Sequence, residues 1–132
     1  MKIPTVDSTG KPNGYVIPIW NANEEPELRP DQVYLTAVAP HSHKGPHLHK
    51  VRSGLFCCIK GNVRIVWRCG LMYISDPSGE DYDYQCISIR PGTPACIYND
   101  SDEEALVLNM PSPAWCAEDP DECPVEDWNP PV

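Results

Sequence analysis

The sequence predicts an all-β protein, built as either a sandwich or a barrel. Its 132 residues include 16 prolines and 8 glycines, which favour turns and interrupt helices. Short runs rich in β-branched and aromatic residues recur along the chain, with turn-forming residues between them. Apolar stripes at helical spacing are short and broken. A chain of this length forms one domain, residues 1–132, with a core at about 15–110 and an extension at 111–132.

The first expected strands lie on either side of a histidine-rich stretch. The segment 15–20 (YVIPIW) is apolar with an internal proline, which suits the edge of a sheet. The segment 33–40 (VYLTAVAP) alternates and is rich in β-branched and aromatic residues. Residues 54–60 and 62–67 form two further strands, and Gly61 makes the tight turn that joins them.

The second half of the sequence contains shorter strands between pronounced turns. The sequence Asp-Pro-Ser-Gly at 76–79 is typical of a turn, because these residues favour turn conformations. Strands are expected on both sides of it and further along the chain, at residues 72–75, 84–90, 95–98 and 105–110.

The extension at 111–132 is rich in proline and acid, which excludes regular structure. It holds 6 of the 19 acidic residues and none of the 10 basic ones. Its two tryptophans, Trp115 and Trp128, are large apolar side chains of little use to a solvated tail. We therefore expect them to pin the extension across the barrel, where it would help to close a site.

Composition argues against several classes of protein. The net charge is −9, whereas domains that bind a nucleic acid polymer are basic. The N-terminus carries no charged-then-apolar leader, and no apolar run approaches about 18 residues, so we expect a cytoplasmic protein without a membrane span. The 7 cysteines are odd in number and form no CxxC pair, which favours reduced, buried thiols over a disulfide framework.

Basic residues are concentrated in one part of this acidic chain. Of the 10 lysines and arginines, 6 fall between positions 44 and 68: Lys44, Lys50, Arg52, Lys60, Arg64 and Arg68. Such a cluster in an acidic protein favours a small anionic ligand, such as a phosphate.

All 4 histidines lie within nine residues, next to the first of these bases. They occupy odd positions, so an unbroken strand would project them from one face: His41, His43, His47 and His49. Gly45-Pro46 breaks the strand, because proline cannot donate to a ladder and glycine permits a kink. Only His47 and His49 are therefore expected on one face.

Two segments resemble the motifs of the cupin superfamily. The run HLH at 47–49, followed by Gly54 and Gly61, has the spacing of the first motif, in which a glutamate follows HxH and a glycine ends the motif. Residues 90–99 (RPGTPACIYN) are similar to the second motif, which has proline, glycine, histidine and asparagine at fixed spacing. The resemblance implies a cupin jelly-roll barrel, a double-stranded β-helix, over about residues 33–110.

The departures from these motifs concern metal ligands. Metal-binding cupins have a glutamate where this sequence has Ser53 or Gly54, and a second-motif histidine where it has Ala95. With those ligands missing, the resemblance implies chemistry without a metal. The alternative is a metal-dependent cupin whose ligands come from its histidines: His41, His43, His47 and His49.

Within the cupins, the sequence resembles the dTDP-4-dehydrorhamnose 3,5-epimerases and related isomerases of nucleotide sugars. Residues 44–47 (KGPH) are similar to the Arg-Gly-Leu-His segment of that family, whose basic residue contacts pyrophosphate and whose histidine is the catalytic base. The resemblance implies that His47 removes a proton beside the 4-keto group of a nucleotide-linked 4-keto-6-deoxy sugar, without a cofactor. Lys44, His49 or Arg52 would stabilise the enolate oxygen.

The position of the acid is a further departure from that family. The family's acidic tyrosine falls at Asn109 and its active-site lysine near Gly54, and Tyr98 is the nearest tyrosine. Candidate substrate-binding residues are Arg52, Arg64, Tyr98 and Asn109. Double epimerisation, single epimerisation and 3,4-ketoisomerisation all stay open.

The same departures leave open a non-catalytic cupin that binds a nucleotide sugar. The expected partners are the small-molecule nucleotide sugar and, because members of this family pair through exposed strand edges, a second copy of the chain in a homodimer.

Overall fold

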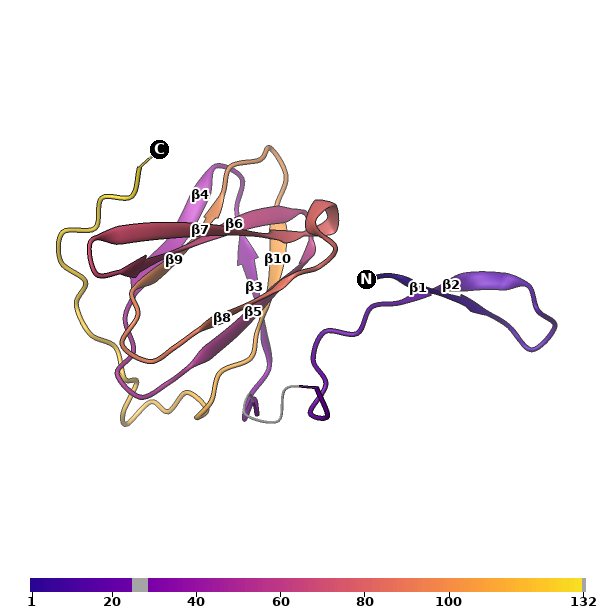
Figure 1. Cartoon of the computed structure of the whole chain (residues 1–132), viewed down its shortest axis with the longest axis horizontal. Helices are drawn as coiled ribbons and strands as arrows, with labels where there is room; N and C mark the ends of the chain where they lie inside the picture. The colour runs from indigo at the N-terminus through magenta and orange to yellow at the C-terminus, as the bar shows by residue number, and fades with distance from the viewer. Residues whose placement is uncertain (25–28, 132) are drawn as a thin grey trace.

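Two four-stranded antiparallel sheets form the body of the molecule and enclose its core (Figure 1). The computed structural model describes residues 1–24 and 29–131. In the first sheet the order is β3-β10-β5-β8, made of Tyr34–Val38, Ala105–Asn109, Gly54–Lys60 and Cys86–Ile89. In the second the order is β4-β9-β6-β7, made of Ser42–His47, Ala95–Asn99, Asn62–Cys69 and Met72–Gly79. The all-β jelly roll predicted from the sequence is confirmed.

Alternating side chains place the core between these sheets. Ile65 of β6 is fully buried there, packed with Val38, Cys58 and Val107 of the facing sheet. The intervening residues of β5 point to the other side of its sheet, where Leu55 and Cys57 form a second apolar cluster. This period of two is the reason that 54–60 was predictable as a strand.

The N-terminal segment forms a separate two-stranded hairpin beside the barrel (Figure 1). Its strands are β1, Ile3–Val6, and β2, Pro12–Val16. The expected strand at 15–20 is therefore wrong beyond Val16, and β1 was not expected. The apolar residues that suggested a strand, Ile17, Ile19 and Trp20, instead pack against the second apolar cluster and so cover the outer face of a sheet.

The turn expected at 76–79 is also wrong. These residues continue β7 and pair with β6, with Pro77 opposite Arg64 and Gly79 opposite Asn62. Strand β7 lies at the edge of its sheet, where a proline without an N–H interrupts no ladder. Pairing along the whole of β6 therefore overrides the local turn preference, and the chain turns afterwards through the short 3₁₀ helix Glu80–Tyr82.

From residue 111 to residue 131 the C-terminal extension runs over the barrel surface without strands (Figure 1). Trp128 pins it as expected, since its indole Nε1 donates to the Tyr98 hydroxyl at 2.9 Å and its ring meets Tyr73 edge to face at 5.1 Å. Across the residues that the structure describes, no helix has the length and apolar character needed to cross a membrane.

Candidate active site

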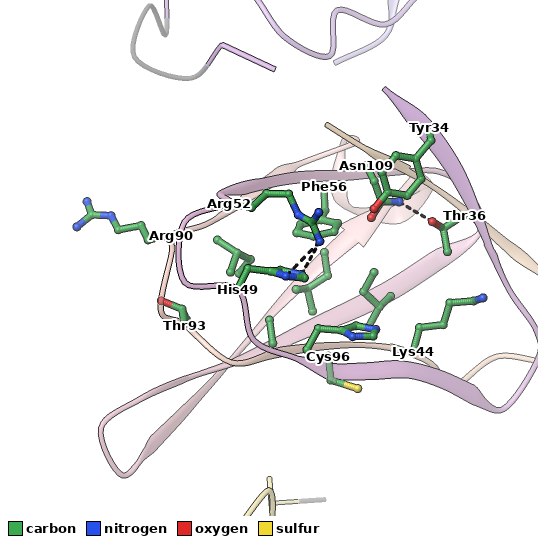
Figure 2. A pocket seen from close by; sticks show the side chains of 16 residues that line it. Tyr34, Thr36, Lys44, His49, Arg52, Phe56, Arg90, Thr93, Cys96 and Asn109 are labelled. Carbon is green, nitrogen blue, oxygen red and sulfur yellow. Dashed lines mark hydrogen bonds between the residues drawn. The ribbon is translucent and has the colours of Figure 1, made fainter. Parts of the chain in front are cut away.

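A cavity of about 250 Å³ opens between the two sheets at one end of the barrel (Figure 2). One wall comes from β3, β5 and β10, the other from β4 and β9, and the segments after β4 and β8 form the rim. The cavity brings together five residues that the sequence indicated: Lys44, His47, His49, Arg52 and Asn109.

A β-bulge in β4 decides which side chains reach this cavity. Lys44 pairs with Ile97 of β9, whereas His47 pairs with Ala95, so β4 has one residue more than its partner. The bulge needs Gly45, whose φ is 112° and whose added Cβ would lie 3.0 Å from the Ala95 carbonyl oxygen. The extra residue reverses the parity of the strand, so Lys44 and His47 line the cavity together.

The bulge also separates the histidines, as the Gly45-Pro46 break predicted. The ring of His43 lies 5.4 Å from that of Tyr98 between centroids, tilted by 32°, and Tyr98 lies outside the cavity. His41 contacts the exposed Asp102 carboxylate at 2.6 Å. Neither lines the cavity with His47 and His49.

His47 and His49 lie side by side, with their ring centroids 6.2 Å apart and their planes inclined by 13°. Burial lowers the pKa of His47 below its ordinary value of 6.5. The Glu122 carboxylate raises this pKa, but burial outweighs it, and the charges of His49, Arg52 and Lys44 lower the pKa further. His47 is therefore neutral near pH 7, the state in which an imidazole accepts a proton.

Arg52 brings a buried positive charge to the cavity. Its side chain is only 8% exposed, and its Nη2 lies 3.1 Å from Nδ1 and 3.3 Å from Nε2 of His49 (Figure 2). No carboxylate of residues 1–24 or 29–131 forms an ion pair with this guanidinium. A buried cation without a counter-ion favours an anion or a developing negative charge beside it.

The opposite wall contributes two polar side chains that were not predicted from the sequence, Tyr34 and Thr36. Tyr34 and Asn109 are paired across β3 and β10, and Figure 2 shows the Tyr34 ring beside Asn109 with its hydroxyl directed toward the cavity. The Asn109 amide donates to the Thr36 hydroxyl at 2.7 Å. The sequence carried a signal for both residues. Tyr34 and Thr36 occupy even positions in the strand, as the buried Val38 does, so the three side chains are on the same face of β3.

A second hollow of about 420 Å³ extends the cavity outward, and both share Tyr34, His47, His49 and Arg52. The hollow is completed by Gln32, Trp115 and Glu122. Gln32 accepts a hydrogen bond from the backbone N–H of Trp115 at 3.0 Å, and the Trp115 side chain is 49% exposed. Trp115 thus lies at the mouth of the site, which agrees with the expected placement of the extension.

Arg64 and Tyr98 do not belong to this site, which corrects their assignment as substrate contacts. Both side chains line a hollow elsewhere on the β4-β9-β6-β7 sheet, where the Arg64 guanidinium lies 4.4 Å from the Tyr98 ring centroid. Arg64 also donates to Asp100 at 2.6 Å. The two residues pair directly across β6 and β9, so they share a face of the sheet, and that face is opposite to the one bearing the buried Ile65.

The ligand set of the metal-dependent alternative is not brought together. Within the described parts of the chain, no three His, Cys, Asp or Glu side chains are grouped as metal ligands would be. His41 and His43 have the separate contacts given above, and Gly54 and Ala95 line the cavity at the positions of the missing motif ligands.

Comparisons with known proteins agree with this architecture. No protein-family model and no curated protein matches the sequence. Among solved structures, a dTDP sugar isomerase from Desulfovibrio desulfuricans G20 has a TM-score of 0.79 at 18% identity, over 96% of this chain and 82% of that one. QdtA, a sugar 3,4-ketoisomerase from Thermoanaerobacterium thermosaccharolyticum in complex with TDP, has a TM-score of 0.72 at 17% identity, over 96% and 85%.

A third similar structure is part of a larger protein. The capsular polysaccharide assembling protein CapF from Staphylococcus aureus has a TM-score of 0.66 at 21% identity, over 71% of this chain. The match spans only 26% of CapF. At these identities the comparisons establish the fold, and the resemblance predicted from the two motifs is confirmed at that level.

Proposed function

We propose that this chain is a nucleotide-sugar epimerase or isomerase that acts on a 4-keto-6-deoxy sugar by removing and returning a proton. One observation carries the proposal: His47, neutral and accessible, shares a cavity with the buried guanidinium of Arg52, which forms no ion pair with a carboxylate of residues 1–24 or 29–131. Together they provide a base for a carbon acid and a positive charge for the resulting enolate.

The proposed reaction begins at the carbon next to the ketone. His47 takes the proton from C3, the bonding electrons form a C3–C4 double bond, and the C4 oxygen becomes an enolate beside Arg52. A proton returned to the other face of C3 inverts that centre. Alternatively, the 3-hydroxyl proton moves to the C4 oxygen and C4 is protonated, which gives the 3-keto isomer.

The two walls of the cavity support chemistry on both faces of a sugar. His47 comes from β4 of one sheet, whereas Tyr34 comes from β3 of the other. We assign Tyr34 the role of acid opposite His47, in place of the tyrosine that the family resemblance led us to seek at Asn109. Asn109 instead offers its side chain, held by Thr36, as a hydrogen-bonding group for the sugar.

The connected hollows suit the two parts of a nucleotide sugar. The inner cavity, about 250 Å³, would hold the hexose over His47 and His49. The outer hollow, about 420 Å³, would hold the nucleoside, for which the half-exposed indole of Trp115 offers a stacking surface. Lys44 and Arg52, which line the inner cavity, offer positive charge to the diphosphate and the enolate.

The homodimer remains part of the proposal. The N-terminal hairpin exposes apolar side chains, including Val6, Tyr15 and Val16, and a two-stranded hairpin on its own is marginally stable in water. Burial of that surface against a second copy would stabilise it. The cytoplasmic location also stays a prediction.

Incubation with dTDP-4-keto-6-deoxyglucose in the presence of a chelator tests this function. We expect ¹H NMR to reveal a C3 epimer or a 3-keto isomer, and the coupling constants of the product distinguish the two. Unchanged sugar with saturable binding of the nucleotide would instead identify the non-catalytic alternative. Turnover that stops with chelator and returns with added metal would identify the metal-dependent one.

A further inference from the structure

Residues 121–123 of the extension form a strap along the segment that follows β4. The Asp121 carboxylate accepts hydrogen bonds from the backbone N–H groups of Lys50, Val51 and Arg52, at 2.9, 2.9 and 2.8 Å. Two residues further on, the Cys123 N–H donates to the Leu48 carbonyl at 2.9 Å. The strap is thus bonded at both ends to the loop that carries two pocket side chains.

One strap contact fixes the protonation pattern of His49. The backbone carbonyl of Asp121 lies 2.7 Å from Nδ1 of that ring. A carbonyl oxygen only accepts, so Nδ1 carries the hydrogen and Nε2 of the neutral ring keeps its lone pair. Nη2 of Arg52 lies 3.1 Å from Nδ1 and 3.3 Å from Nε2, and of these two nitrogens Nε2 is the one that can accept from it in this tautomer.

The backbone at Asp121 explains why this residue type suits the position. Its φ is 52°, in the left-handed region that aspartate and asparagine enter more readily than other side chains with a Cβ. No Lys, Arg or His of residues 1–24 or 29–131 forms an ion pair with its carboxylate. The hydrogen bonds from the loop N–H groups, that of Arg52 first, lower the pKa of Asp121 below its ordinary value.

We propose that Asp121 is a positioning residue of the active site, whose side chain holds the 50–52 loop and whose carbonyl holds the tautomer of His49. The extension then contributes to the active site, because the strap fixes the position of Arg52 and determines which nitrogen of His49 can accept a hydrogen bond. The proposed consequence for turnover rests on the proposed function, whereas the consequence for His49 does not.

The direct test is the tautomer of His49, measured by two-dimensional ¹H–¹⁵N multiple-bond NMR and assigned with His49→Gln. We expect the Nδ1–H form in the wild-type protein. Asp121→Ala keeps the backbone carbonyl but removes the carboxylate that holds it beside the 50–52 loop. The carbonyl should then move away from Nδ1, and the ring should shift toward the Nε2–H form that free histidine prefers. Asp121→Asn, which keeps one acceptor oxygen and tolerates the left-handed backbone, should shift the pattern only in part.

A matched control lies two residues away. Asp119 is exposed, and its side chain makes none of the loop contacts, so Asp119→Ala should leave the His49 tautomer unchanged. With substrate, Asp121→Ala should lower kcat roughly 10- to 100-fold while KM changes less, because misplaced groups lose contact chiefly with the enolate. Asp119→Ala should keep wild-type kinetics.

An unchanged His49 tautomer in Asp121→Ala would overturn the proposal, and so would wild-type kcat in that variant. If Asp121→Ala does not fold, the tautomer and kcat of Asp121→Asn decide in the same way, since removal of the charge should still shift both partly. A tautomer that shifts in a protein without any turnover would support the strap while contradicting the proposed function.

Discussion

Replacement of His47 by glutamine is expected to lower kcat/KM by roughly 10²- to 10⁴-fold, the range typical for removal of a general base. Glutamine keeps polar atoms near the cavity wall but cannot take up a proton at neutral pH. Because His47 is accessible and lies at the end of β4, the fold and nucleotide binding should survive. Steady-state kinetics with isothermal titration of dTDP separate the two effects.

His43→Gln is the matched control, because His43 lies on the same strand but contacts Tyr98 outside the cavity. Its kinetics should resemble those of the wild-type protein.

The pH profile of kcat/KM gives an independent check of the role of His47. Burial lowers the pKa of His47 below 6.5, so the base stays neutral and kcat/KM stays high until the pH falls to that lowered pKa. Full activity in His47→Gln would remove His47 from the mechanism.

Replacement of Tyr34 by phenylalanine is expected to have the second largest effect and a different signature. Loss of the hydroxyl removes the proposed acid, so product formation should fall by roughly 10²- to 10⁴-fold. Removal of the C3 proton does not need that hydroxyl, so exchange of this proton with solvent should continue. We expect a protein that exchanges the substrate proton but makes little product.

Product NMR and exchange NMR on the same sample measure the two rates. Tyr82→Phe is the control, since Tyr82 lies on the 3₁₀ helix and lines the hollow that contains Arg64, not the candidate active site. If Tyr34→Phe loses exchange and product equally, Tyr34 serves binding or the first proton transfer. If it forms product at the wild-type rate, the acid lies elsewhere.

The sequence predicted the structure correctly where the local residue pattern and the pairing of the strands favour the same conformation. Strand β5 alternates between two buried faces, and its limits at 54 and 60 were predicted to the residue. The break at Gly45-Pro46 correctly separated His47 from His43, because a bulge is a local property of the strand. Lys44, His47, His49, Arg52 and Asn109 were therefore found in one cavity.

The parts of the site that the sequence did not predict depend on contacts between segments that are far apart in the chain. Tyr34 reaches the cavity because β3 pairs with β10, which places it opposite Asn109, 75 positions along the chain. Arg64 was misplaced because a basic residue in a strand can face either side, and its partner Tyr98 shows that it faces away. The Asp121 carboxylate accepts from backbone N–H groups of the 50–52 loop, and such donors leave no sequence motif because every residue except proline supplies one.

Solvent deuterium entry into the substrate tests the central claim most directly. The wild-type protein and His47→Gln are incubated with dTDP-4-keto-6-deoxyglucose in deuterated water, and the C3 position is followed by NMR. We expect deuterium at C3 with the wild-type protein and none above the background rate with His47→Gln. Equal exchange with both proteins, or none with the wild-type protein although it binds the nucleotide sugar, would contradict proton removal by His47.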